Sequence, residues 1–175
     1  MRGDVTVSPG RRRGRPCYGG GVHPPGSRTS IPQFGKRVPG RAYIERPGAY
    51  AVIVNERGEV ALIRVPQGYF LPGGGIDPHE DALTALAREV REETGHEVQV
   101  VRELGQAAQF LVARYEELFL NKVGRFFVAR LGPKTQEAHE VDHSLEWLPL
   151  AEARKRLRHE FQVWALEQFE STRGT

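Results

Sequence analysis

The sequence predicts one α/β (α+β) domain in which a mixed sheet carries helices on its faces. Short β-rich runs alternate with segments of helical periodicity, and two of the runs are close enough in sequence to form a hairpin. The chain has 175 residues, of which 39% are hydrophobic, so it is long enough to bury one sizeable core. No segment of the sequence is repeated.

Seven β-rich runs are expected to form strands. The first two, 50–55 and 59–65, flank a short turn in which Gly58 supplies a permissive backbone, and they are predicted to form a hairpin. A brief strand at 68–71 then leads into a glycine-rich loop. The remaining strands are expected at 97–104, 107–114, 124–131 and 145–150.

Helices are predicted after the glycine-rich loop and at the C-terminal end. We expect Asp77 to cap the first helix, with Pro78 at its first position and Glu80 reaching back as in a capping box. Gly95 supplies the left-handed residue that ends this helix. From Leu150 onward, apolar residues recur at helical spacing and predict one or two amphipathic helices.

Residues 1–40 differ in composition from the rest of the chain. They contain eight basic residues against one acidic residue, together with nine of the twenty glycines and six of the twelve prolines. Such a segment buries too little apolar surface to offset its ordering entropy, so we interpret it as a disordered extension and place a single domain at 41–175. Removing the extension is expected to leave activity and melting temperature nearly unchanged.

The motif RRRGRP within this extension is similar to the Arg-Gly-Arg-Pro core of AT-hook segments, which bind the minor groove of A·T-rich DNA. The match is four residues long in a segment already rich in arginine, glycine and proline. We therefore favour a solvated tail, or translated sequence ahead of the natural start, and do not expect nucleic-acid binding.

The sequence also limits the compartment and the class of protein. No run approaches the roughly 18 apolar residues of a membrane span, and no apolar segment follows the arginine-rich N-terminus as in a secretory signal. The single cysteine, Cys17, excludes an internal disulfide framework and a cysteine-based zinc site. We expect a cytoplasmic protein that does not bind membranes and that is a monomer or a homodimer.

Three glutamates lie close together in the stretch AREVREETG of the first predicted helix. At about 100° per residue, Glu89, Glu92 and Glu93 share an arc of about 100°. That arc borders the apolar stripe containing Leu86 and Val90 and does not occupy the middle of the outward face. A solvated face would not be placed this way, whereas a hard divalent cation such as Mg²⁺ suits clustered carboxylates beside a core.

The loop LPGGGIDP before this helix places three glycines between a strand and a helix start. Glycines there allow unusual backbone angles and bring backbone amides and carbonyls close to a ligand. The loop matches neither a Walker loop nor the dinucleotide pattern G-x-G-x-x-G.

Together, the loop and the helix resemble the Nudix box, G-x5-E-x7-R-E-U-x-E-E-x-G-U, in which U is a bulky apolar residue. Gly74, Glu80 and the run from Arg88 to Gly95 occupy every fixed position, and only the final U differs, because His96 stands there. The resemblance implies a Nudix-type α/β/α sandwich with a mixed sheet, a catalytic loop and helix, and C-terminal helices.

The resemblance implies a hydrolase of phosphorus-containing anhydrides that cuts nucleoside diphosphate derivatives with the help of Mg²⁺ or Mn²⁺. By position in the box, Glu92 and Glu93 are implied as metal ligands. Glu89 is implied as a third ligand, or as the residue that acts as or orients the base on the attacking water. Clustered cations of this kind neutralise charge on phosphate oxygens and activate water near neutral pH.

The remaining positions of the box are implied to support this chemistry. Gly74 would offer its carbonyl to a metal, and Gly73 and Gly74 would border the substrate. Arg88 would pair with a carboxylate and fix its orientation. Glu80 and Gly95 are implied to be structural.

In some members of the family the base comes from a loop outside the box, and 137–143 is the matching candidate here. Glu140 is our first choice as an additional ligand or base, with His143 beside it; the alternative is an ordinary solvated loop. Arg64 is a candidate for the substrate phosphates or is simply solvated. Phe70 is a candidate for stacking on a base or for core packing.

The box leaves the group attached to the diphosphate open. The flanking sequence is most similar to members that act on canonical or oxidised (d)NTPs, so we predict a pyrophosphohydrolase for such nucleotides. Leu111 stands where the ADP-ribose group has proline, and Tyr115 does not match cleanly the tyrosine of the dinucleoside polyphosphate group. Dinucleoside polyphosphates, ADP-ribose or sugar nucleotides, and RNA 5′ ends remain alternatives, as does a non-catalytic module that senses nucleotides.

Overall fold

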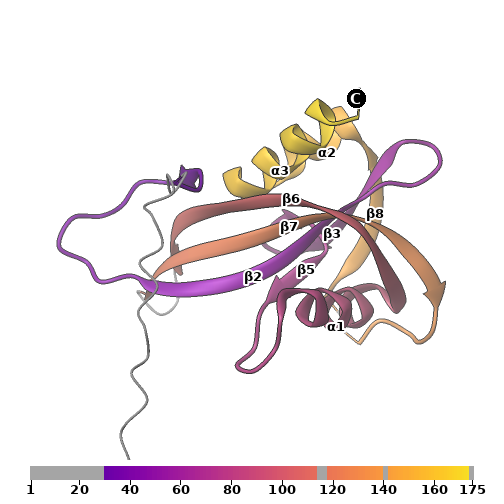
Figure 1. Cartoon of the computed structure of the whole chain (residues 1–175), viewed down its shortest axis with the longest axis horizontal. Helices are drawn as coiled ribbons and strands as arrows, with labels where there is room; N and C mark the ends of the chain where they lie inside the picture. Colours follow the sequence, from indigo (N-terminus) through magenta and orange to yellow (C-terminus); the bar gives the residue numbers. More distant parts are fainter. Residues whose placement is uncertain (1–29, 114–117, 140–141, 174–175) are drawn as a thin grey trace, which may run out of the picture. The chain divides into compact units, whose positions relative to one another are not determined.

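The computed structural model describes residues 30–113, 118–139 and 142–173, and contacts group Ile31–Thr175 as one compact unit. The strands and helices of this unit are shown in Figure 1. The elements are β1 (Gln33–Phe34), β2 (Ile44–Ile53), β3 (Glu59–Val65), β4 (Gly68–Phe70), β5 (Gly73–Gly75), α1 (Ala82–Thr94), β6 (His96–Ala113), β7 (Leu118–Lys134), β8 (Ser144–Pro149), α2 (Leu150–Arg156) and α3 (Glu160–Ser171).

The strands form two sheets. The larger sheet has the order β1-β6-β7-β2-β5, and it is mixed because β2 is parallel to β7 but antiparallel to β5. The smaller sheet has the order β4-β3-β8 and is antiparallel throughout. The predicted mixed sheet is therefore confirmed.

In the larger sheet, β2 is buried on both of its faces over residues 48–53. Tyr50 and Val52 point into a core that includes residues of α2 and α3, whereas Ala49, Ala51 and Ile53 point into a second core formed with α1. Successive side chains of a strand point to opposite faces of the sheet. A strand that is apolar at every position therefore needs other elements packed against both faces. Figure 1 shows α1 on one side of the sheets and α2 and α3 on the other, which confirms the predicted α/β/α arrangement.

Two predicted features of the sheets are wrong. The runs 50–55 and 59–65 do not form a two-stranded hairpin. The Val54–Val60 bridge and a 3.0 Å hydrogen bond from the Asn55 N–H to the Glu59 carbonyl join them at the turn, but beyond it they continue into different sheets. The two strands expected at 97–104 and 107–114 form the single strand β6. A glycine at residue 105 has φ 124°, and the register against β7 shifts beside it, so the strand bends there without ending.

The compact unit begins at Ile31, so the boundary predicted at residue 41 lies inside it. β1 pairs in parallel with β6, and the N–H of Gly35 donates to Glu160 Oε2 at 3.1 Å. Phe34 packs against the core that contains α3. Averaged over forty residues, the composition hides this short docked segment. Most of the predicted extension, residues 1–29, lies outside the described residues.

The docked segment changes the expected outcome of truncation. Deleting residues 1–40 removes β1, the Gly35–Glu160 hydrogen bond and the Phe34 contact, so we expect the melting temperature to fall by roughly 5–10 °C. Deleting residues 1–29 alone keeps these contacts and is expected to leave the melting temperature within about 2 °C. Thermal denaturation of the two truncated chains and the full chain measures both changes. Equal melting temperatures for all three would contradict the contribution of β1.

No helix in the described part of the chain combines the length and apolar character needed to cross a membrane.

Candidate functional site

The glycine-rich loop and α1 form one side of the candidate site. β5 lies at the edge of the larger sheet, where Gly73 pairs with Tyr50 and Gly74 with Ala49. Gly73 has φ 122°, and a Cβ there would collide with the carbonyl oxygen of Ala49. Glycine at this position therefore allows β5 to lie directly against β2.

α1 begins later than predicted. Its N-cap is Asp81, whose side chain accepts a hydrogen bond from the Thr84 N–H at 2.8 Å, so Asp77 is not the cap and Pro78 is not the first helical residue. Glu80 does reach back, since its Oε2 accepts the N–H of Asp77 at 3.1 Å, but this contact closes a turn ahead of the helix. The predicted end is confirmed, because Gly95 is the left-handed C-cap with φ 75°.

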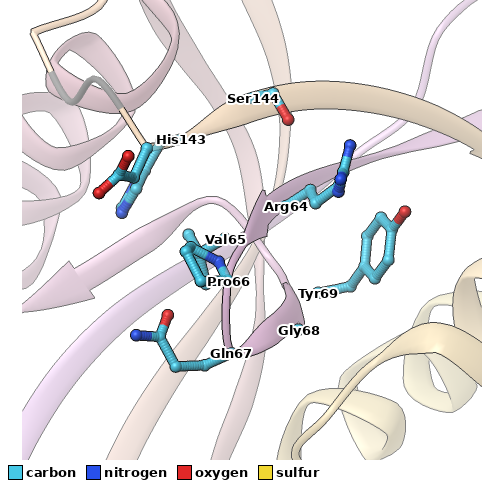
Figure 2. Close-up of a pocket in the computed structure, with 9 residues that line it drawn as sticks. Arg64, Val65, Pro66, Gln67, Gly68, Tyr69, His143 and Ser144 are labelled. Carbon is cyan, nitrogen blue, oxygen red and sulfur yellow. The ribbon is translucent and has the colours of Figure 1, made fainter.

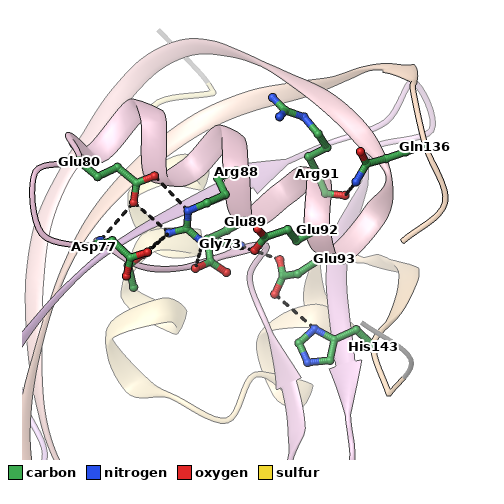
Figure 3. A network of polar contacts seen from close by, with 11 residues as sticks. Gly73, Asp77, Glu80, Arg88, Glu89, Arg91, Glu92, Glu93, Gln136 and His143 are labelled. Atoms are coloured by element: carbon green, nitrogen blue, oxygen red, sulfur yellow. Dashed lines mark hydrogen bonds and ion pairs between the residues drawn. The ribbon is translucent and has the colours of Figure 1, made fainter. Parts of the chain in front are cut away.

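Arg88 is the centre of a polar network on the helix (Figure 3). Its guanidinium donates to both carboxylate oxygens of Glu80, at 3.0 and 2.9 Å, and to Oε1 of Glu89 at 2.8 Å. It also donates to Oε2 of Glu92 at 3.3 Å and to the carbonyl of Gly75 at 3.0 Å. The arginine lowers the pKa of Glu80, chiefly by hydrogen bonding. One planar cation thus orients three carboxylates and fixes the loop to the helix.

Glu93 faces away from this network and is buried, with 6% of its surface exposed. Its Oε2 accepts the N–H of Gly73 at 2.9 Å, and its Oε1 lies 3.7 Å from Nδ1 of His143 (Figure 3). The carboxylate is therefore positioned between the glycine loop and the segment that enters β8.

Gly74 lies directly against Glu89. A Cβ built on Gly74 would lie 2.5 Å from the carboxylate carbon of Glu89, so only glycine leaves that carboxylate its place. The nearby Tyr50 hydroxyl has a raised pKa, first because it is buried and then because Glu89 and Glu93 are negative. The phenol consequently stays protonated at physiological pH and is a hydrogen-bond donor.

The donor set fits a hard divalent cation by its chemistry. Glu89 lies against Gly74, Glu93 accepts the N–H of Gly73, and Glu92 is joined to Glu89 through Arg88, so three carboxylates lie near one loop. The negative charges of Glu89 and Glu93 both raise the pKa of the Tyr50 hydroxyl. Within the described ranges, no three His, Cys, Asp or Glu side chains are already gathered as a metal cluster. Glu89 and Glu92 are drawn to Arg88, whereas Glu93 is turned to Gly73. Binding a cation requires the flexible ends of these side chains to turn.

The segment 135–139 is joined to the C-terminal end of α1. The backbone N–H groups of Thr135 and Gln136 donate to the carbonyl of Gly95, at 2.8 and 3.3 Å, and that of His139 donates to the carbonyl of Glu92 at 2.9 Å. Four residues further on, His143 lies next to Glu93. Glu140, the predicted extra ligand or base, lies outside the described residues, so its assignment stays a prediction.

A cavity of about 230 Å³ opens beside these groups. Part of its lining was predicted from the sequence: the glycine loop, Glu93 and Phe70. The prediction missed four polar residues that other elements contribute to the lining. They are Tyr50, Lys122, His159 and Gln162. The alternation of side chains along β7 could have indicated Lys122, because it places the lysine on the same face of the strand as Gly124 and Phe126, both of which are buried.

Arg64 lies in a different place from the other predicted substrate-binding residues. Ile63 and Val65 line the cavity at the glycine loop, and the alternation of the strand turns Arg64 the other way. Its guanidinium pairs with Glu146 Oε1 at 3.4 Å, and it lines a second cavity of about 670 Å³ together with Tyr69 and His143 (Figure 2). Contact of Arg64 with a substrate phosphate stays a prediction.

His159 gives the site a dependence on pH. Burial, followed by the positive charges of Lys122 and Arg158, lowers the pKa of His159 to about 4, against about 6.5 in an unfolded chain. Between these values the unfolded chain binds a proton that the folded domain does not bind, so folding stability falls as the pH decreases from about 6.5 to about 4.

Replacing His159 by glutamine is expected to remove this acid sensitivity. We expect the loss of unfolding free energy between pH 7 and pH 4.5 to be about 1–3 kcal/mol smaller in His159→Gln than in the unmodified chain. Urea denaturation at the two pH values measures the difference. An unchanged loss in the variant would show that His159 is not the responsible group.

Comparisons with known proteins identify the family of the domain. The profile of the NUDIX domain matches residues 44–169. Nudix hydrolase 7 of Arabidopsis thaliana is 28% identical over 116 residues, which are 60% of this chain and 39% of that protein. A protein of Bacillus subtilis, provisionally named as an 8-oxo-dGTP diphosphatase, is 38% identical over 61 residues, which are 33% of this chain and 40% of that protein.

Among solved structures, the MutT protein of Methanosarcina mazei Go1 has a similar fold. The TM-score is 0.59 at 23% identity, over 76% of this chain and 98% of that one. This chain spans about two fifths of the length of the two relatives, 39% and 40%. The domain profile, in contrast, covers most of the chain and includes both the glycine loop and all of α1. The chain belongs to the NUDIX domain family.

Proposed function

We propose that the domain hydrolyses a diphosphate bond in a nucleoside diphosphate derivative, with a divalent cation as cofactor. The observation that carries the proposal is the grouping of three carboxylates near the glycine loop. Glu93 accepts the Gly73 N–H and lines the cavity of about 230 Å³, Glu89 lies against Gly74, and Glu92 shares the guanidinium of Arg88 with Glu89. A diphosphate is a dense anion that three carboxylates would repel, unless cations lie between them. Mg²⁺ or Mn²⁺ bound there would neutralise the phosphate oxygens and lower the pKa of an attacking water.

The residues of the chain supply position and protonation state. Arg88 holds Glu89 and Glu92 on the side of the helix that faces the loop, and the Gly73 N–H does the same for Glu93. The protonated Tyr50 hydroxyl is a donor at the wall of the cavity. Glu89, which lies against Gly74, is our choice for the residue that takes or directs the proton of the water.

For the substrate we propose a (d)NTP or an oxidised dNTP, which would be cut to a nucleoside monophosphate and pyrophosphate. The support is the resemblance of the box and its flanks to members that act on such nucleotides, together with the 38% identity to the Bacillus subtilis protein over 61 residues. Dinucleoside polyphosphates, ADP-ribose and sugar nucleotides are the alternatives within the same reaction class.

A substrate panel tests the proposal. The full chain is incubated with dGTP, 8-oxo-dGTP, ADP-ribose and diadenosine tetraphosphate at millimolar Mg²⁺, and the products are separated by ion-exchange chromatography. We expect pyrophosphate and a monophosphate from one of the first two nucleotides, and no products when EDTA replaces the metal. Release from another member of the panel would correct the substrate, whereas binding of all four without products would indicate a sensing module.

A further inference from the structure

Lys122 is a cation at the point where three cavities meet. It is partly buried on β7, and it lines the cavity at the glycine loop, one of about 630 Å³ that includes Arg46, and one of about 720 Å³ that includes Arg158 and Gln109. Arg46 and Gln109 are its register partners on the two neighbouring strands, so the three side chains share one face of the sheet.

Within the part of the chain that the structure describes, the ammonium group of Lys122 forms no ion pair and donates no hydrogen bond. Burial lowers the pKa of Lys122, and the charge of Arg46 lowers it further, while Glu89 acts in the opposite direction from a distance. Removing a cation from water without a partner costs stability, so the fold gains nothing from this charge.

The position of Lys122 matches the far side of a bound diphosphate. β7 lies two strands from β5 in the larger sheet, which is roughly 10 Å at the usual strand spacing. Lys122 shares its face of β7 with Phe126, which packs in the core that contains α3, so its side chain lies on the side of the sheet opposite α1. Both Lys122 and Glu93 line the cavity at the glycine loop. Phe70 and His159 continue from Lys122 into the cavity of about 720 Å³, whose wall is partly apolar.

We propose that Lys122 is a positioning residue that binds a phosphate oxygen of the substrate opposite the carboxylates of α1. The nucleotide then lies across Lys122, with its diphosphate at the glycine loop and its remaining part in the cavity bounded by Phe70, Gln109 and His159. This inference rests on the proposed function, because it assigns the phosphate of the same substrate.

The test compares Lys122→Met, Lys122→Arg and the control Arg130→Met. Arg130 is an exposed residue of the same strand, so its variant loses the same charge away from the cavities. Each protein is titrated calorimetrically with α,β-methylene-dGTP at millimolar Mg²⁺, and kcat and KM are measured with the best substrate of the panel. Melting temperatures are recorded for all of the proteins.

We expect Lys122→Met to weaken binding of the analogue and raise KM by about 10–100-fold, the usual effect of losing one charged hydrogen bond, with a smaller change in kcat. Lys122→Arg should stay within about tenfold of the unmodified chain because it keeps the charge, and Arg130→Met should be unchanged. The melting temperature of Lys122→Met should be equal or higher, which a structural role for the lysine would not produce.

The two proposals fail separately. If the unmodified chain cuts no nucleotide of the panel but Lys122→Met still binds the analogue more weakly, the phosphate contact is supported and the hydrolase is rejected. Turnover by the unmodified chain with equal KM and equal affinity in Lys122→Met would reject the role of Lys122 and keep the hydrolase. A lower melting temperature with unchanged affinity would also overturn the inference, since it would make Lys122 a structural residue.

Discussion

Glu92→Gln is expected to reduce nucleotide hydrolysis by roughly 10³-fold or more, because a metal held by carboxylates supplies several kcal/mol of transition-state stabilisation. The substitution keeps the size of the side chain and removes its charge. Glu92 is the most exposed of the three carboxylates, with 38% of its side chain accessible, and it accepts a 3.3 Å hydrogen bond from Arg88. We therefore expect the melting temperature to change little. Product release at saturating Mg²⁺ measures the effect.

Glu152→Gln is the matched control for this experiment. Glu152 lies on α2, pairs with Arg156, and has 38% of its side chain accessible, as Glu92 does, so its variant should hydrolyse nucleotides at the normal rate. Normal turnover in Glu92→Gln would remove the basis for a metal-dependent reaction at α1.

Gly74→Ala is expected to lower kcat by roughly 10²-fold while folding stability stays close to that of the unmodified chain. The added methyl group would lie 2.5 Å from the carboxylate carbon of Glu89, and this flexible side chain can turn aside at little cost. The backbone of Gly74 is outside the left-handed region, so alanine introduces no backbone strain there. Displacing a reacting group by about 1 Å is enough for a loss of this size.

Gly75→Ala separates this local effect from a general effect on the loop. A Cβ at Gly75 meets no atom within 4 Å, and its φ is also outside the left-handed region. We expect this variant to keep its activity. Equal losses of kcat in the two alanine variants would refute the specific contact between residue 74 and Glu89.

The sequence predicts the end of α1 and the placement of its glutamates because local rules determine them. A left-handed glycine ends the helix at Gly95, and helical spacing alone places Glu89, Glu92 and Glu93 beside an apolar stripe. The start of the helix was misjudged because Asp77 and Asp81 both precede it. Asp81 is the cap, while Asp77 belongs to a turn that Glu80 closes. Local sequence does not distinguish two such aspartates.

Long-range pairing was not predictable from the same information. A short turn between two β-rich runs usually indicates a hairpin, but β2 pairs with β7, 76 residues further along the chain. The same limitation concealed Lys122, since its importance depends on three cavities that only the assembled sheet creates. The docked residues of β1 were likewise hidden by the composition around them.

The attachment of 135–139 to the end of α1 gives Gly95 a second function. A side chain at Gly95 would collide with the carbonyl oxygen of Gln136, so it would push this connection off the helix as well as strain the cap. The backbone of Glu92 would then lose its partner at His139, and the chain leading to His143 would lose its anchor. A substitution at Gly95 would thus displace residues near His143 as well as the end of α1. The final glycine of the motif therefore holds together two segments that are forty residues apart in the sequence.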